Sequence, residues 1–194
     1  KERIRIAKKQ TPKNYRLVIA ATMVCWIAVS GFVYYNTQVL NSYKNNNELE
    51  QLAADYENKY KKYEHVAFPK ISDLKYFIDI FPYKRDVFVK AEMTMVNEST
   101  SIIDSIHYSI DARWEPEIKI PNSELVLDDK NLEYRIYKLS KPMNPGDTIH
   151  IEINTQYLSK GFKNNGAYSK IVNNGTFLTN LQILPLIGYQ ASIE

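Results

Sequence analysis

The chain has 194 residues, of which 44% are hydrophobic, and its formal net charge is +3. This length suits one globular domain of ordinary size plus an appendage. Residues 1–16 hold seven Lys or Arg and one Glu, whereas the other 178 residues hold 18 basic and 21 acidic residues. Because the basic excess lies entirely at the N-terminus, the composition argues against a nucleic-acid-binding globule.

The first expected element is a membrane-spanning helix over residues 17–35, LVIAATMVCWIAVSGFVYY, where no charge occurs for 19 positions. A helix of that length is roughly 28 Å long, about the thickness of a bilayer's hydrocarbon core. Aromatic rings are favoured at the membrane interface. We therefore expect Arg16, Trp26, Tyr34 and Tyr35 to be anchor residues in contact with a lipid bilayer.

The basic tail of residues 1–16 gives this span a direction. The positive-inside rule places the tail in the cytoplasm, and everything after Asn36 outside the inner (cytoplasmic) membrane, in the periplasm or extracellular space. A buried core helix is one alternative. A cleaved signal peptide is another, because Ala28-Val29-Ser30 resembles a cleavage site. The apolar run continues through Phe32–Tyr35, which favours an uncleaved anchor.

Residues 36–69 are expected to hold an amphipathic stalk helix and a linker. Within residues 38–65, apolar and aromatic side chains recur at spacings of three and four, while Glu, Lys and Asn fill the other faces; the stripe comprises Leu49, Leu52, Tyr56, Tyr60 and Tyr63. Two interpretations remain open. The helix lies against the following domain, or its tyrosine stripe contacts lipid headgroups or a partner helix.

From Lys70 to the end of the chain the hydrophobic period falls to two, which is typical of strands. Five segments read as strands: 74–80, 87–96, 102–111, 132–139 and 148–157. Turn residues separate them, with Asn144-Pro145-Gly146-Asp147 fitting a type II turn and Asn174-Gly175 suiting a hairpin. Residues 70–194 therefore predict a mainly β domain made of two layers of antiparallel sheet.

Motifs for catalysis or metal binding do not emerge from the sequence. The three histidines are isolated, and zinc-protease, CxxC, nucleophile-elbow and phosphate-loop patterns are missing. His107 and His150 lie in expected strands, which favours hydrogen-bonded or surface roles. Three aspartates suggest a carboxylate cluster only weakly: Asp79, Asp104 and Asp111. Two segments match the glycosylation pattern, which is short enough to arise by chance: Asn97-Glu98-Ser99 and Asn174-Gly175-Thr176. We expect no catalytic residue, metal ligand or cofactor in this chain.

Three segments together resemble the N-terminal β domain of the aminopeptidase N-type zinc metallopeptidases: KISDLKYFIDIFPYKRDVFVKAEMTMVNEST, IIDSIHYSID and YRIYKLSKPMNPGDTIHIEINTQY. A basic tail, one span and a Tyr/Lys-rich helix before such a domain resemble bacterial proteins that fuse an ABC-type permease to an aminopeptidase. The resemblance implies a saddle-like β domain that helps to wall a peptide-binding cleft. Its implied partners are a downstream catalytic domain, other membrane subunits and a peptide substrate.

The family's diagnostic residues are not in this sequence. Its zinc helix and its Gly-x-Met-Glu-Asn loop would lie beyond Glu194, so zinc is expected only in a downstream domain. The Gln-x-Glu-Pro-like segment that meets the substrate's amine is replaced by Thr176–Asn180, and we consider Asn180 and Gln182 as substitutes. A non-catalytic β-sandwich module that binds a transporter or envelope partner is the second hypothesis. A secreted β protein with a cleaved leader is the third.

The closing segment LQILPLIGY, residues 181–189, is apolar and contains a proline and a glycine. In the aminopeptidase reading, it is a linker that lies along a following domain. We therefore expect residues 181–189 to be poorly packed or to lean on a neighbour.

Overall fold

The computed structural model describes residues 2–3, 5–6, 12–41, 43–114, 116–162 and 171–191. The chain forms two compact units. One comprises residues 1–43 and 160–167, and the other, the β domain, comprises residues 44–159 and 168–194.

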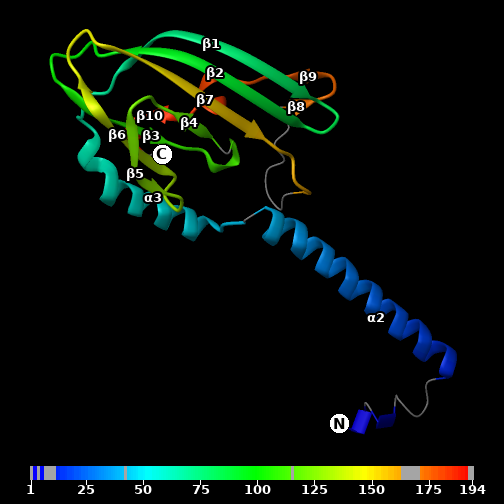
Figure 1. The fold of residues 1–194 in the computed structure, drawn as a ribbon. Coiled ribbons are helices and arrows are strands. Elements are labelled where there is room, and N and C mark those ends of the chain that lie inside the picture. The colour runs from blue at the N-terminus through cyan, green and yellow to red at the C-terminus, as the bar shows by residue number, and fades with distance from the viewer. Residues whose placement is uncertain are drawn as a thin grey trace. The chain divides into compact units, whose positions relative to one another are not determined.

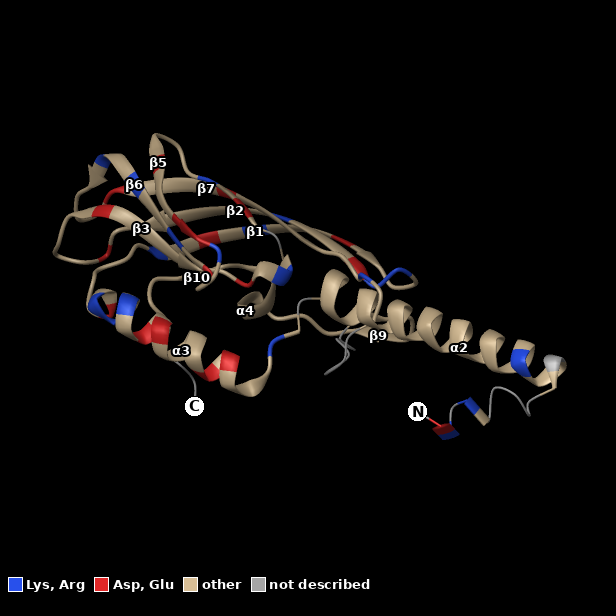
Figure 2. Ribbon diagram, turned by 90° about the horizontal axis from the view of Figure 1, so that it is seen from below, with Lys and Arg blue, Asp and Glu red and all other residues tan. Residues whose placement is uncertain are grey.

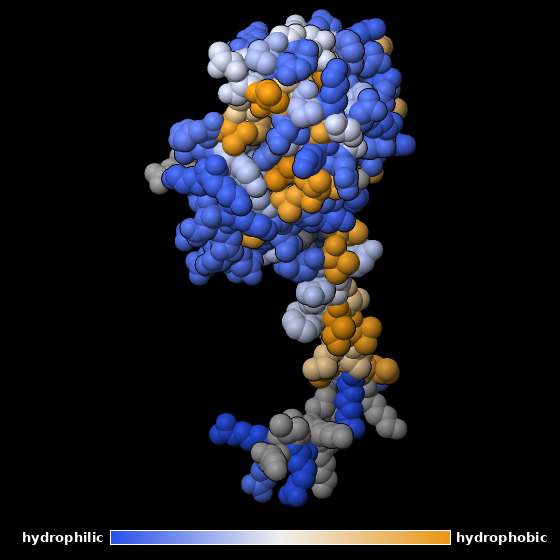
Figure 3. Space-filling model, turned by 60° about the vertical axis from the view of Figure 1, so that its left-hand side comes forward, coloured by the Kyte–Doolittle hydropathy of each residue, from blue (hydrophilic) through white to orange (hydrophobic). Residues whose placement is uncertain are grey.

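The first unit is built on helix α2 (Lys13–Tyr34), which continues as the π-helix η1 (Tyr35–Leu40). The stretch Asn14–Leu40 is long and apolar enough to cross a membrane, with a mean hydropathy of 2.1. It extends five residues beyond the expected end at Tyr35. The side chains of Asn36 and Thr37 donate hydrogen bonds back to the carbonyls of Phe32 and Val33, so these polar residues are satisfied within the helix. Figure 3 shows apolar residues covering α2.

The β domain begins with helix α3 and is otherwise mainly strands (Figure 1). Its elements, in chain order, are α3 (Asn46–Tyr60), η2 (Lys61–Tyr63), β1 (Lys70–Phe81), β2 (Asp86–Val96), β3 (Ile103–Ser109), η3 (Ala112–Trp114), β4 (Glu117–Lys119), β5 (Ser123–Asp129), β6 (Tyr134–Met143), β7 (Thr148–Tyr157), β8 (Ile171–Val172), β9 (Gly175–Thr176), α4 (Asn180–Ile183) and β10 (Leu186–Ile187). All five expected strands are present.

Two four-stranded antiparallel sheets form the layers of this domain. Sheet A has the order β1-β2-β7-β4 and sheet B the order β10-β3-β6-β5. The alternation seen in the sequence sets their inner faces. Ile151 and Ile153 of β7 are buried between the sheets, with Met93 and Met95 of β2, and Ile106 of β3 faces them from sheet B. The expected mainly β, two-layer antiparallel fold with an N-terminal apolar helix and a second helix is confirmed.

Local turn chemistry explains the connections. The amide of Asp147 donates to the carbonyl of Asn144, and Gly146 has φ 87°, as position i+2 of a type II turn requires. This expected turn joins β6 to β7. The second expected hairpin joins β8 to β9, but its two loop residues are Asn173 and Asn174, and Gly175 already belongs to β9.

Helix α3 covers the outer face of sheet B (Figure 1). Its start is a capping box in which the side chains of Asn45 and Glu48 each accept the other residue's backbone amide. The Tyr60 ring stacks on Tyr134 of β6 with 4.1 Å between ring centroids, and the Tyr56 hydroxyl lies 2.8 Å from the Ser109 hydroxyl of β3. The tyrosine stripe is therefore used for packing on the domain, and the first interpretation of the stalk helix is confirmed.

The expectation that residues 181–189 are poorly packed is wrong. Ile183 and Leu184 are buried in the core, although Leu181 is exposed. Leu186 and Ile187 form strand β10, which pairs with Ser109 and Tyr108 of β3. The segment is thus the edge strand of sheet B. Its partner strand lies nearly eighty residues earlier in the chain, so no local pattern reveals the pairing.

A glycine is required where this closing segment turns. Gly188 has φ 79°, and a Cβ at this position would lie 2.6 Å from the Phe68 ring. Its amide donates to the His107 carbonyl at 2.9 Å. The next residue, Tyr189, stacks on Tyr56 with 5.4 Å between centroids and donates its hydroxyl to Glu57 of α3. Gly188, Tyr189 and helix α3 therefore pack together at the outer face of sheet B.

Candidate functional site

A groove of about 940 Å³ lies along strand β7, where β4 leaves sheet A. We call it the β7 groove. Its apolar lining includes Met93, Ile118, Ile120, Leu125, Tyr137 and Ile151. Its polar lining includes Asp73, Lys75, Glu92, Thr94, Lys119, Ser123, His150 and Glu152. A mostly apolar concavity with polar groups around it is the usual form of a binding site.

The groove exists because strand β4 is short. Its ladder with β7 covers three residue pairs, from Glu117–Asn154 to Lys119–Glu152. Pro121 follows two residues later, and proline has no amide hydrogen to continue a ladder. The Ser123 hydroxyl donates to the Ile120 carbonyl at 2.9 Å, and the chain then enters sheet B as β5.

The departure of β4 leaves part of β7 without a neighbour on one side. Among the described residues, Thr148–Ile151 pairs with β2 on one side only, in the register Val96–Thr148 to Met93–Ile151. In an antiparallel strand, alternate residues direct their N–H and C=O groups to each side. The free edge of β7 is thus four residues long, about 13 Å at 3.3 Å per residue, and its residues His150 and Ile151 line the groove.

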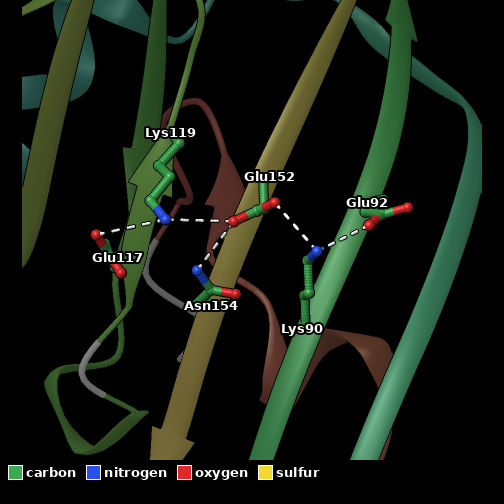
Figure 4. A network of polar contacts seen from close by, with 6 residues as sticks. All are labelled: Lys90, Glu92, Glu117, Lys119, Glu152 and Asn154. Carbon is green, nitrogen blue, oxygen red and sulfur yellow. Dashed lines mark hydrogen bonds and ion pairs between the residues drawn. The ribbon is translucent and has the colours of Figure 1, made fainter.

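Ion pairs cover the outer face of sheet A next to the groove (Figure 4). Lys90 lies 2.9 Å from Glu92 and 3.2 Å from Glu152, while Lys119 lies 3.3 Å from Glu152 and 3.8 Å from Glu117. Hydrogen bonds from Lys90 and Asn154 lower the pKa of Glu152, and those to Glu92 and Glu152 raise the pKa of Lys90. The contacts favour the charged forms of Glu152 and Lys90 and hold the side chains of this network in place.

The groove lining carries a small negative charge. It contains three acidic residues, Asp73, Glu92 and Glu152, and two lysines, Lys75 and Lys119. The Thr94 hydroxyl lies 2.9 Å from Nδ1 of His150, an exposed residue on the free edge. This arrangement has the features of a binding surface for an uncharged or weakly basic extended ligand.

Asn180 and Gln182 are both on α4, and neither lines the β7 groove. The Gln182 side chain accepts the Thr179 backbone amide at 3.2 Å in the capping box of this helix, which gives it a local structural role. Asn180 is exposed. Their role in substrate binding remains a prediction.

The expected anchor residues all lie on the apolar helix of the first unit. Arg16 is in the first turn of α2, Trp26 is at its middle, and Tyr34 and Tyr35 are at the junction with η1. Trp26 is 71% exposed, and Tyr34 and Tyr35 are also exposed. The Asn41 side chain, just past the helix, donates to the carbonyls of Lys160 and Phe162 at 2.7 and 3.2 Å within the same unit.

The remaining candidates have structural explanations. His107 is buried on the face of sheet B under α3, where Nδ1 lies 3.0 Å from the Tyr134 hydroxyl, so it is a hydrogen-bonded histidine as expected. Asn97 is 1% exposed and donates to the carbonyls of Ser101 and Met143, so its glycosylation pattern is inaccessible in the folded domain. Within the described residues, no group of three or more His, Cys, Asp or Glu is placed to hold a metal.

Apart from His150, the groove residues were not singled out from the sequence. Strand β4 is only three residues long, so it shows no periodic pattern. Pro121 beside Asn122, which has φ 52°, is the one local signal that a strand ends at this point. That signal marks a turn, but it does not show that the turn opens a groove between the sheets.

No protein-family model matches the chain, and no curated protein matches it.

Proposed function

We propose that this chain is a membrane-anchored β domain that binds an extended peptide segment in the β7 groove. The observation that carries the proposal is the free edge of β7, whose residues His150 and Ile151 line an apolar groove. An extended peptide adds to such an edge through main-chain hydrogen bonds, and neighbouring pockets select its alternate side chains. The net negative lining favours a segment that is neutral or weakly basic.

The anchor in this proposal is the helix Asn14–Leu40. The basic tail lies in the cytoplasm and the β domain lies outside the inner membrane, in the periplasm or extracellular space. The tail has six excess positive charges, from seven basic residues and one acidic residue in residues 1–16. Such a charge difference is the main determinant of orientation for a single span.

The resemblance to aminopeptidase N-type proteins gives the peptide a specific role. In that version of the proposal, the β domain walls the cleft of an aminopeptidase-like protein fused to an ABC-type permease. Zinc would be held by another domain, where it would polarise the scissile carbonyl and activate water. In the other version, the domain is a non-catalytic module that binds a segment of a transporter or envelope partner.

Peptide selection tests the groove directly. The full 194-residue chain, reconstituted in lipid nanodiscs, is presented to a displayed library of short random peptides, and the affinities of selected peptides are measured by fluorescence anisotropy. We expect selected peptides to slow amide hydrogen exchange at Thr148–Ile151, because they would cover that edge. Failure to select any peptide, or binding that leaves this edge unprotected, would show that the proposal is wrong.

A matched pair of substitutions on β5 provides the control. Leu125 lines the groove, and its neighbour Val126 does not, although both are exposed. Leu125→Asp should weaken peptide binding by about tenfold or more, since a partly buried leucine contact is replaced by a charge. Val126→Asp adds the same charge beside the groove and should change the affinity by less than about twofold.

The two versions of the proposal differ in whether the native polypeptide holds a catalytic zinc ion. The mass and the zinc content of the native polypeptide, purified from its membrane, distinguish them. The aminopeptidase version expects a longer polypeptide with one zinc site outside residues 70–194. A stoichiometric zinc site within residues 70–194 would contradict the aminopeptidase version, in which another domain holds the zinc.

A further inference from the structure

The loop that joins β1 to β2 and the strand residues beside it carry an exposed group of aromatic and basic side chains. We call Phe77, Phe81, Tyr83, Lys84, Arg85 and Phe88 the hairpin-end surface. Tyr83 is 89% exposed at the tip, and the three phenylalanines are 40 to 48% exposed. The rings of Phe81 and Phe88 meet edge to face with centroids 5.8 Å apart. This conformation keeps apolar rings in contact with solvent.

The backbone at the tip is well defined. The amide of Lys84 donates to the Phe81 carbonyl at 3.1 Å, and that of Arg85 donates to the Pro82 carbonyl at 3.3 Å. Pro82 restricts the loop further because its ring fixes φ. Since the loop is held by its own hydrogen bonds, its exposed rings are presented by the fold and can bind a partner with little loss of conformational entropy.

Positively charged side chains lie beside the aromatic rings of the hairpin-end surface. The loop Pro82–Arg85 has two positive residues and no negative one, and is marked in blue in Figure 2. Over Lys75–Lys90 there are four basic residues and two acidic ones. Lys75 and Lys90 lie over the Phe77 ring, with Nζ 4.8 and 6.0 Å from its centroid. One of the acidic residues, Asp86, accepts the Ser159 amide at 2.9 Å.

The chain itself connects this end of the sheet to the candidate span. Tyr157, at the end of β7, pairs with Val87 beside the loop. Ser159 is the last residue of the β domain at this point, and Lys160 begins the segment that belongs to the unit of α2. The covalent chain thus leaves the β domain for the anchor's unit from the end that carries the hairpin-end surface.

We propose that the hairpin-end surface docks on the headgroup region of the bilayer that holds the anchor, with preference for anionic lipid. Aromatic rings with lysine and arginine are the side chains that favour a membrane interface. Tyr83 and the phenylalanines enter the interface, while Lys84 and Arg85 contact lipid phosphates. This docking is separate from the β7 groove and would hold even if the groove bound no peptide.

Lipid-quenching fluorescence tests the docking. In the full chain with Cys25→Ser, Tyr83→Cys receives an environment-sensitive fluorophore, and the protein is reconstituted in vesicles of phosphatidylcholine with or without phosphatidylglycerol. Thr100→Cys, an exposed position near the opposite end of β2, is the labelled control. We expect the Tyr83 label to shift to shorter wavelength and to be quenched by headgroup-level spin-labelled lipid, whereas the Thr100 label keeps its aqueous emission.

Charge removal provides a second measurement. Lys84→Gln and Arg85→Gln should each lower the docking equilibrium constant roughly fivefold in anionic vesicles, since each basic residue contributes about 1 kcal/mol near such a surface. Equal lipid quenching at positions 83 and 100 would overturn the proposal. Unquenched emission of the labelled protein, together with oxidative disulfide crosslinking between unlabelled Tyr83→Cys chains, would also overturn it and would assign the surface to a second copy of the chain.

Discussion

The two sheets of the β domain have the same number of strands and share one core, yet their outer faces differ. Sheet B is covered by α3 (Figure 1), on which Tyr189 of the segment after β10 stacks through Tyr56. Its outer face has aromatic rings, among them Tyr60, Tyr134 and His107. Sheet A has no such covering helix among the described residues, and its outer face has the ion pairs of Lys90, Lys119 and Glu152.

The comparison shows that burial beneath α3 changes the pKa values of polar groups and their contribution to stability. Burial, and then the hydrogen bond to Asp129, raise the pKa of Tyr60 to about 12. Burial alone would raise the pKa of Asp129, but hydrogen bonds from Lys59, Tyr60 and the Leu132 amide outweigh this and lower it to about 2. On the open face, water competes with every ion pair, so similar contacts contribute little to stability. The covered face therefore stabilises the domain, and the open face is available for binding.

The largest expected effect is the loss of Tyr60 from the covered face. Tyr60→Ala removes a buried ring that stacks on Tyr134, and should destabilise the β domain by about 3–5 kcal/mol. Denaturant unfolding followed by near-ultraviolet circular dichroism measures this loss. Leu49→Ala, on an exposed position of α3, is the control and should stay within about 0.5 kcal/mol of the unaltered chain. Equal effects of the two substitutions would mean that α3 does not cover sheet B.

The second effect is a pH dependence from His107. Burial lowers its pKa from 6.5 to about 4, against a smaller opposing effect of Asp104. The unfolded chain therefore binds a proton first, and stability that is complete above pH 6.5 is lost as the pH falls towards 4. The difference corresponds to at most roughly 3 kcal/mol.

This pH dependence is measured as the free energy of unfolding at several values between pH 7 and pH 4. His107→Gln should remove this part of the slope, whatever its effect at neutral pH. Leu49→Ala, which replaces an exposed side chain that does not titrate, should keep the slope of the unaltered chain. If His107→Gln left the slope unchanged, His107 would not be a buried neutral group.

The smallest effects come from neutralising one carboxylate on each face. Asp129 has a side chain 12% exposed and binds Lys59 and Tyr60, whereas Glu152 is 34% exposed and binds Lys90 and Lys119. Asp129→Asn should cost about 2 kcal/mol, because hydrogen bonds to a charged group are lost. Glu152→Gln should cost less than Asp129→Asn, because solvent screens the ion pairs of an exposed carboxylate. Thermal unfolding of the two variants measures the loss of stability in each. A larger loss for Glu152→Gln would mean that the open face of sheet A, and not the covered face of sheet B, contributes more to stability.

Some of these features follow from local sequence alone. The uncharged run of residues 17–35 and the period-two alternation of β7 specify a span-like helix and a strand without reference to distant residues. The Asn144–Asp147 turn is equally local, since Pro145 and Gly146 have the backbone preferences of a type II turn. In each case the physical cause lies within a few residues, in hydrophobic periodicity or in restricted φ and ψ angles.

The candidate site and the covered face depend on contacts between distant residues. The role of Tyr60 requires Tyr134, the strand status of Leu186 and Ile187 requires β3, and the β7 groove requires β4 to leave sheet A opposite Ile151. Each of these is a non-local pairing, whose free energy depends on where other segments lie. The sequence by itself determined the apolar span, the stalk helix, the five expected strands and the apolar faces of those strands. Only the tertiary structure decided which outer face is covered and which strand edge stays open, because burial is a property of the assembled layers.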